Sequence, residues 1–126
     1  MTTTTTIDDE NNLVSFKNSG YRTTETVALA ESTVRQQFEK NGKVLLLIDW
    51  TEFQGETGDI LGLIWNVAKL SLLVERVALI SGENMKSEVE KWQDKVEEVP
   101  IRHFGPEEFS DARTWLITSD EKAVDI

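Results

Sequence analysis

The residues VLLLIDW at positions 44–50 form an almost continuously apolar run. Such a run is typical of a parallel β-strand that is covered on both of its faces. A polar turn with two glycines follows at 51–58, and the sequence DILGLIWNVAKLSLL then predicts a helix over 58–73. A buried strand that leads into a long helix is the repeating unit of an α/β fold.

The same alternation continues along the rest of the chain. Strands are predicted at 13–18, 77–81 and 101–104, and the weak alternation of the first one suggests an edge strand. The chain is therefore expected to form a mainly parallel sheet of about four strands with helices.

Capping signals place the other three helices. Thr23 or Thr24 is suited to begin the first helix, and Gly42 is suited to the left-handed position after its end. A third helix is predicted to begin near Asn84 or Ser87. Pro106 fits the first position of a fourth helix, whose Phe109, Ala112 and Leu116 are expected to face the core.

Length and composition divide the 126 residues into one domain and two ends. Segment 1–12 is threonine-rich and acidic, and this composition predicts disorder. Residues 118–126 form a polar, acidic tail. A single domain is therefore expected over 13–117.

The charge and the residue types exclude several classes of function. A net charge of −10 with scattered lysines and arginines argues against a nucleic-acid partner. No apolar run reaches the roughly 18 residues of a transmembrane segment. The chain has no cysteine, which excludes disulfides and thiolate metal sites and suits a cytoplasmic location.

The strand GKVLLLID, the segment RVALISGENMKSEVEKW and the closing stretch IRHFGPEEFSDARTWL together resemble the SpoIIAA-like proteins. These proteins are relatives of the STAS domains of anti-sigma-factor antagonists, and the resemblance covers about 13–117. It implies a β-α superhelix of about four turns, as in the CRAL-TRIO domains. It also implies a bacterial-type, non-enzymatic binding or regulatory module, for which lipid or membrane association is a suspected role.

Catalytic chemistry is hard to assemble from this chain. His103 is its only histidine, and it lies in a short strand between Arg102 and Phe104. No P-loop or dinucleotide-binding motif is present, and no spacing of histidine and carboxylates predicts a metal site. We therefore expect no enzyme, no cofactor and no metal.

Two features predict where a ligand or partner would bind. Ligands of parallel α/β folds bind beyond the carboxyl ends of the strands, where Asp49, Trp50 and Phe53 are expected. The alternative is that Trp50 and Phe53 fill the core. Helix 58–73, which includes Leu61 and Trp65, has apolar residues over roughly 220° of its circumference.

That wide apolar arc has three competing explanations. The helix is buried against a neighbouring helix, or forms a homodimer or protein-partner interface, or covers an apolar small molecule, a lipid or a peripheral membrane surface.

Thr57 carries an alternative function. In the STAS antagonists a phosphorylatable serine or threonine begins this same helix, and Thr57–Gly58 is similar to that motif. The resemblance then implies a protein-interaction switch phosphorylated at Thr57. The other interpretation is that Thr57 only caps the helix.

Overall fold

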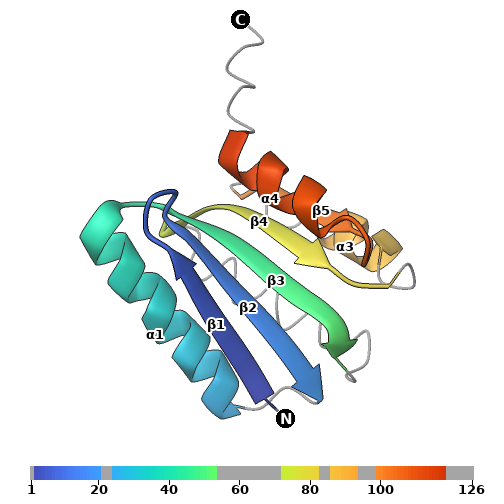
Figure 1. Cartoon of the computed structure of the whole chain (residues 1–126), viewed down its shortest axis with the longest axis horizontal. Helices are drawn as coiled ribbons and strands as arrows, with labels where there is room; N and C mark the ends of the chain where they lie inside the picture. The colour runs from blue at the N-terminus through green and yellow to red at the C-terminus, as the bar shows by residue number, and fades with distance from the viewer. Residues whose placement is uncertain (1, 21–23, 54–71, 83–85, 94–98, 119–126) are drawn as a thin grey trace, which may run out of the picture.

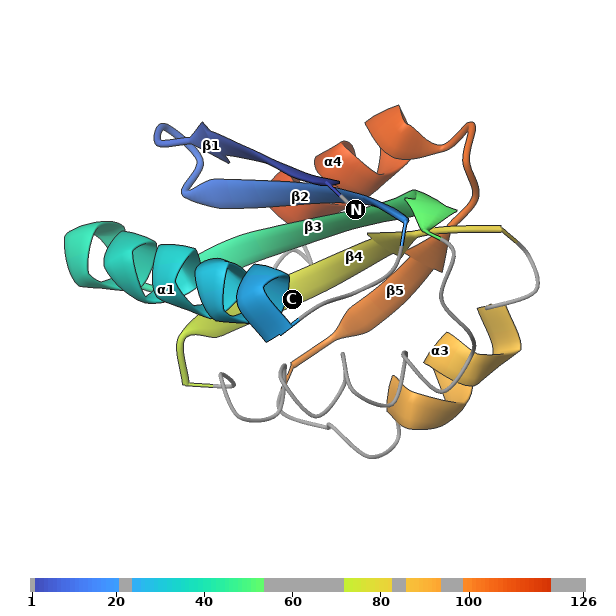
Figure 2. The ribbon, with the colours of Figure 1, turned by 90° about the horizontal axis from the view of Figure 1, so that it is seen from below.

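The computed structural model describes residues 2–20, 24–53, 72–82, 86–93 and 99–118, and Figure 1 shows their arrangement. The elements follow in the order β1 (Thr2–Asp8), β2 (Leu13–Gly20), α1 (Thr24–Asn41), β3 (Val44–Phe53), β4 (Val74–Ile80), α3 (Lys86–Gln93), β5 (Ile101–Phe104) and α4 (Phe109–Thr118). Helices α1 and α3 lie on one face of the sheet, and α4 lies on the other (Figure 2).

The described strands form one five-stranded sheet in the order β1-β2-β3-β4-β5. The pairs β2/β3, β3/β4 and β4/β5 are parallel, whereas β1 and β2 are antiparallel. The prediction of a mainly parallel α/β sheet is therefore confirmed. Two details were wrong: the sheet has five strands rather than four, and β2 lies inside the sheet because β1 covers its outer edge. The superhelix and the relation to CRAL-TRIO domains stay predictions.

The additional strand β1 comes from the segment predicted to be disordered. Residues from Thr2 to Asp8 pair with β2 from Ser19 back to Leu13, so the structure differs from that prediction. Threonine is β-branched and fits the pleated surface of a sheet well, even where a repeat of one residue type shows no apolar alternation. The composition predicts disorder because the threonine repeat has few apolar side chains of its own. The partner strand β2 supplies the apolar side chains that the repeat lacks.

The end of β1 and the turn that follows it contact a helix on each face of the sheet. Asp8 Oδ2 accepts a 2.6 Å hydrogen bond from Arg113 of α4. The next residue, Asp9, accepts hydrogen bonds from Gln37 and Lys40 of α1. Because neighbouring side chains leave a strand on opposite faces, two successive carboxylates can reach two different helices.

The same contacts favour the ionised carboxylates. Hydrogen bonds from Asn11 and then Arg113 lower the pKa of Asp8 below its ordinary value. Hydrogen bonds from Gln37 and then Lys40 lower the pKa of Asp9 in the same way.

Helix α1 ends as its sequence predicts. Gly42 has a φ of 92°, and its N–H donates to the carbonyl of Phe38 over 2.8 Å. Asn12, with a φ of 52°, donates through its side-chain amide to the carbonyl oxygens of Gly42 and Lys43. The turn between β1 and β2 therefore holds the end of α1 and the start of β3 together.

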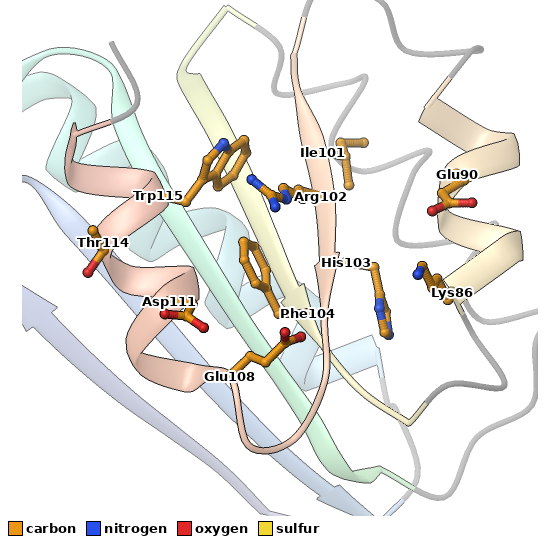
Figure 3. A pocket seen from close by; sticks show the side chains of 10 residues that line it. All are labelled: Lys86, Glu90, Ile101, Arg102, His103, Phe104, Glu108, Asp111, Thr114 and Trp115. Atoms are coloured by element: carbon orange, nitrogen blue, oxygen red, sulfur yellow. The ribbon is translucent and has the colours of Figure 1, made fainter. Parts of the chain in front are cut away.

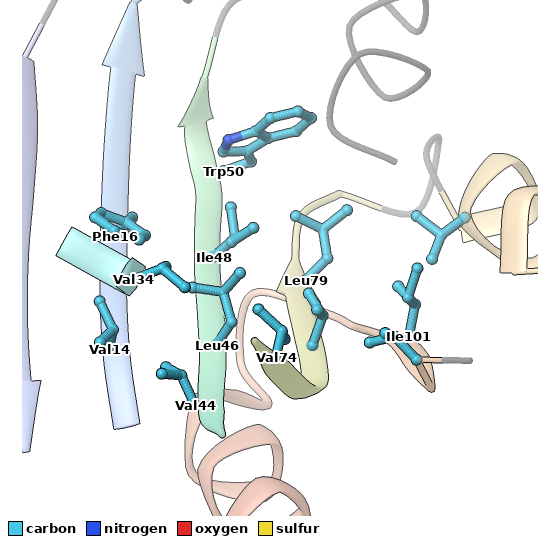
Figure 4. Packing of buried hydrophobic residues seen from close by; sticks show 13 residues of the cluster. Val14, Phe16, Val34, Val44, Leu46, Ile48, Trp50, Val74, Leu79 and Ile101 are labelled. Atoms are coloured by element: carbon cyan, nitrogen blue, oxygen red, sulfur yellow. The ribbon is translucent and has the colours of Figure 1, made fainter. Parts of the chain in front are cut away.

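The core has two parts, one on each face of the sheet. The larger part lies under α1 and α3 and is built around even-numbered β3 residues, from Val44 to Trp50 (Figure 4). The smaller part lies under α4 and contains Leu45 and Leu47 of the same strand. Burial of both faces of β3 confirms the interpretation of its continuous apolar run.

Several predictions about element bounds and faces were wrong, among them the end of β3, which lies at Phe53 rather than Trp50. Helix α4 begins at Phe109, and Pro106 lies in the turn before it. Phe109 is 46% exposed, whereas Ala112 and Leu116 are buried as expected. Leu72 and Leu73, placed at the end of helix 58–73, form a turn that leads into β4. In the described ranges, no helix has the length and the apolar character needed to cross a membrane.

Candidate functional site

The structure separates the residues predicted for the rim after β3. Asp49 is half-buried, and its Oδ1 accepts hydrogen bonds from the N–H and Oγ1 of Thr51, at 2.9 and 2.7 Å. Trp50 points to the other face and is only 5% exposed within the larger core. This burial favours the core role that the sequence left open for Trp50. Phe53 ends β3, and its side chain lies outside the described part.

The other predicted site residues lie outside the described residues. These are Thr57, Leu61 and Trp65, which fall in the range 54–71 together with nearly all of helix 58–73. Their roles in ligand or partner binding, and the phosphorylation of Thr57, stay predictions.

A groove of about 570 Å³ lies instead beside β5, between α3 and α4. In the described sheet β5 is an edge strand, and Figure 3 shows it between the two helices, with β4 behind it. The side chains that line the groove come from α3, from β5, and from α4 with its preceding turn. They are Lys86, Glu90, Ile101, Arg102, His103, Phe104, Glu108, Asp111, Thr114 and Trp115.

Alternation along β5 divides the groove into two compartments. Ile101 belongs to the core under α1 and α3, so it and His103 face the α3 side. Arg102 and Phe104 face the α4 side, where Phe104 joins the smaller core. The groove therefore extends over both faces of one strand, and the edge of that strand runs along its middle (Figure 3).

The α4 compartment holds an arginine on an aromatic support. The guanidinium carbon of Arg102 lies 4.9 Å from the ring centre of Phe104 and 5.9 Å from that of Trp115. The two rings are themselves 5.9 Å apart and tilted by 52°. Such cation–π contacts restrain a guanidinium while its N–H edges stay accessible to an acceptor. Among the described residues, no carboxylate forms an ion pair with Arg102.

Side chains already bond the backbone at both ends of β5. The amide of Gln93 donates through Nε2 to the carbonyl of Val99 over 3.0 Å and accepts a hydrogen bond from the N–H of Ile101. At the other end, Glu108 Oε1 accepts a 2.6 Å hydrogen bond from the N–H of Gly105. Between the contacts of Gln93 and Glu108, the backbone groups directed away from β4 belong to Ile101 and His103.

His103 forms a contact that resembles part of a catalytic site. Its Nε2 lies 2.9 Å from Oγ of Ser81 and 3.2 Å from the carbonyl oxygen of Gly82. Because a carbonyl oxygen only accepts hydrogen bonds, the ring can bond to Gly82 only in the tautomer that carries its hydrogen on Nε2. Ser81 Oγ donates to the same carbonyl over 3.1 Å. In this tautomer Nε2 donates to Ser81 and Gly82, and the contacts join the ends of β4 and β5.

Sequence reasoning found the strand but missed the groove. One available signal was that Arg102 and Phe104, two apart in a strand, must share a face. Another was that Ser81 and His103 end neighbouring parallel strands, whose carboxyl ends meet at one edge. The contributions of Gln93 and Trp115 depend on how α3 and α4 pack, which the sequence pattern does not specify.

The groove and the sheet that carries it belong to a recognisable domain. A family model described as SpoIIAA-like matches residues 13–117. The chain belongs to the SpoIIAA-like family. The match covers every residue of the groove, while β1 lies outside it. The predicted family is confirmed.

A solved structure supports the same fold. It is that of an uncharacterized protein of the DUF3478 family from Shewanella loihica PV-4, with a SpoIIAA-like fold. It matches with a TM-score of 0.68 at 20% identity, over 91% of this chain and 92% of that chain. No curated protein matches this chain significantly. A SpoIIAA-like fold suggests a STAS-type regulatory or binding module, and these matches name no ligand or partner.

Proposed function

We propose that this SpoIIAA-like domain is a non-enzymatic binding module that contacts a protein partner through the groove beside β5. The observation that carries the proposal is the position of the groove. It has a volume of about 570 Å³ and extends over both faces of a strand at the edge of the described sheet. Segments of partner proteins bind in grooves and at exposed sheet edges of folded domains. The proposal includes the cytoplasmic location expected from the sequence.

The lining of the groove favours a protein over an apolar ligand. It contains two cations, Lys86 and Arg102, and carboxylates on both sides of the strand. A lipid chain would leave these charges without partners and partly out of water, which is unfavourable. A polypeptide can supply opposite charges and backbone hydrogen bonds at the same surface.

Binding through helix 58–73 and a phosphorylation switch at Thr57 remain part of the wider proposal. Both concern residues outside the described ranges, so neither gains support from the groove. Mapping of the phosphosite after incubation with a candidate kinase tests the switch, and the absence of label at Thr57 would count against it.

The groove is tested by selecting short linear peptides from a display library on the intact protein. Thr114 is exposed on α4 and lines the groove, so Thr114→Arg should obstruct it. Ser32→Arg on α1 adds the same side chain at an exposed position away from the groove and is the matched control. We expect Thr114→Arg to weaken the selected peptides at least about tenfold, with Ser32→Arg unchanged. Equal binding by both variants would contradict the proposal.

A further inference from the structure

The edge of β5 offers a short series of backbone groups at the centre of the groove. Residues 100 and 104 direct their carbonyl oxygens to β4, where they accept from the N–H groups of Val77 and Ser81. Residues of a parallel strand alternate: one directs both of its backbone groups to one side of the strand, and the next directs both to the other side. Arg102 therefore faces β4, as residues 100 and 104 do. Ile101 and His103 therefore face outward, as the hydrogen bond from Ile101 N–H to Gln93 also indicates.

Most outward groups near these residues are already bonded. Gln93 bonds the carbonyl of Val99 and the N–H of Ile101, as the backbone of a neighbouring strand would. Glu108 bonds the N–H of Gly105, whose carbonyl accepts from Glu108 N–H. Among the described residues, three outward groups are left without such a bond: the carbonyl of Ile101 and both backbone groups of His103.

From this geometry we propose that an extended segment of the partner protein adds a strand to β5 at these three groups. The inference rests on the proposed function and specifies how the partner is held. An added strand hydrogen-bonds to a sheet edge through its main chain, and its side chains alternate between the two faces. The two compartments of the groove, one on each face of β5, match that alternation (Figure 3).

The charges in the α4 compartment specify the side chains of that segment. Arg102 is held on two aromatic rings and has no carboxylate partner among the described residues, so it fits an acidic residue opposite it. Glu108 and Asp111 line the same compartment at its Phe104 end (Figure 3). They fit a basic residue two positions along, since residues i and i+2 of a strand share a face. The partner segment therefore carries an acidic and a basic residue separated by one position.

The backbone contact is tested by two substitutions at one residue. His103→Pro removes the outward N–H, which β4 does not use, and proline is tolerated on a strand edge that faces solvent. His103→Ala loses the same imidazole and its contact with Ser81 but keeps the N–H. We expect peptides selected on the wild-type protein to bind His103→Pro about tenfold more weakly than His103→Ala, as for the loss of one hydrogen bond with its acceptor left unpaired.

Amide hydrogen exchange on the wild-type protein gives a second measurement that holds even if His103→Pro fails to fold. A selected peptide should slow exchange at His103 N–H, with little change at Arg102 N–H, which faces β4. The selected sequences should also be enriched in an acidic and a basic residue separated by one position.

Unchanged exchange at His103, together with equal binding by the two variants, would overturn strand addition. If those peptides were still sensitive to Thr114→Arg, the groove would remain the binding site. If no selected peptide depended on Thr114, the proposed function itself would fail.

Discussion

Arg113 donates a 2.6 Å hydrogen bond to Asp8, and the two residues are 105 positions apart in the sequence. The pair joins the end of β1 to α4 across the face of the sheet that α4 covers. Its side chains are 42% and 22% exposed, so solvent screens the ion pair only in part. The contact therefore helps to fix a strand that lies outside the residues matched by the family model.

Asp8→Asn should lower the free energy of unfolding by about 1 kcal/mol, because an amide forms a weaker hydrogen bond with arginine than a carboxylate does. Urea unfolding measures the change. Glu10→Gln is the control: it removes one carboxylate from an exposed residue of the same turn and should change stability by less than about 0.5 kcal/mol. Equal effects of the two variants would show that the Arg113 contact adds nothing to stability.

The lowered pKa values of Asp8 and Asp9 predict a loss of stability in acid. A carboxyl whose pKa is lower in the folded state stabilises the protein fully above its ordinary pKa, here 3.8. That contribution is lost as the pH falls through the lower folded pKa. The Asp8→Asn, Asp9→Asn double variant should therefore lose less stability than the wild type between about pH 5 and pH 2. Urea unfolding across this range tests the difference, and parallel curves for the two proteins would contradict it.

Arg76 joins β4 to the end of α4 from inside the protein. It is 7% exposed, and its Nη2 donates to the carbonyl of Leu116 in the last turn of that helix. Its Nε is buried without a hydrogen-bond partner among the described residues. Arg76→Ala should cost about 2–3 kcal/mol, because it removes packing and leaves the Leu116 carbonyl unpaired.

Arg76→Met should cost about 1 kcal/mol less than Arg76→Ala, since it keeps most of the volume and also removes the unpaired Nε. Urea unfolding of both variants makes the comparison. A methionine variant no more stable than the alanine variant would show that the guanidinium hydrogen bond, rather than the packing, accounts for the effect.

A substitution of Trp50 tests whether this residue belongs to the core or to a binding rim. Because it is 5% exposed in the larger core, Trp50→Ala should lower the free energy of unfolding by about 3–5 kcal/mol. The adjacent Thr51 is exposed, and Thr51→Ala should cost less than about 1 kcal/mol. A small effect of Trp50→Ala in thermal or urea unfolding would contradict the core role and support the predicted position at the rim.

The tautomer of His103 is open to direct measurement. The contacts of Nε2 with Ser81 and Gly82 predict that the neutral imidazole carries its hydrogen on Nε2. Nitrogen-15 chemical shifts of the ring, recorded at a pH where the imidazole is neutral, identify the tautomer. Ser81→Ala should preserve it, because the Gly82 carbonyl still accepts. A hydrogen on Nδ1 would contradict this geometry and revive the question of a serine–histidine pair.

The elements with strong local signals could be predicted from the sequence. The run from Val44 and the left-handed Gly42 identified β3 and the end of α1, and β5 has its predicted bounds. Strand β1 was missed because its stability comes from pairing with β2, which a threonine repeat does not reveal. The start of α4 was missed because a proline marks a turn as readily as a first helical residue.

The groove was less predictable than the fold, for a physical reason. Its lining combines residues from α3 and α4, which lie on opposite faces of the sheet and meet only around the edge of β5. Local periodicity assigns each helix an inner face but does not say how far that helix lies from a sheet edge. The sequence instead predicts a binding rim at the end of β3, where Trp50 is buried in the core.

The two faces of the sheet are completed at different times during synthesis. The apolar side chains Leu13, Leu45 and Leu47 lie in the core under α4, the last helix of the described chain. A nascent chain that has left the ribosome only as far as β5 has the strands of this face but not the helix that covers it. We expect such incomplete chains to bind chaperones that recognise exposed hydrophobic surface, and to aggregate when they are released from the ribosome. Docking of α4 covers these side chains and also brings Arg113 to Asp8.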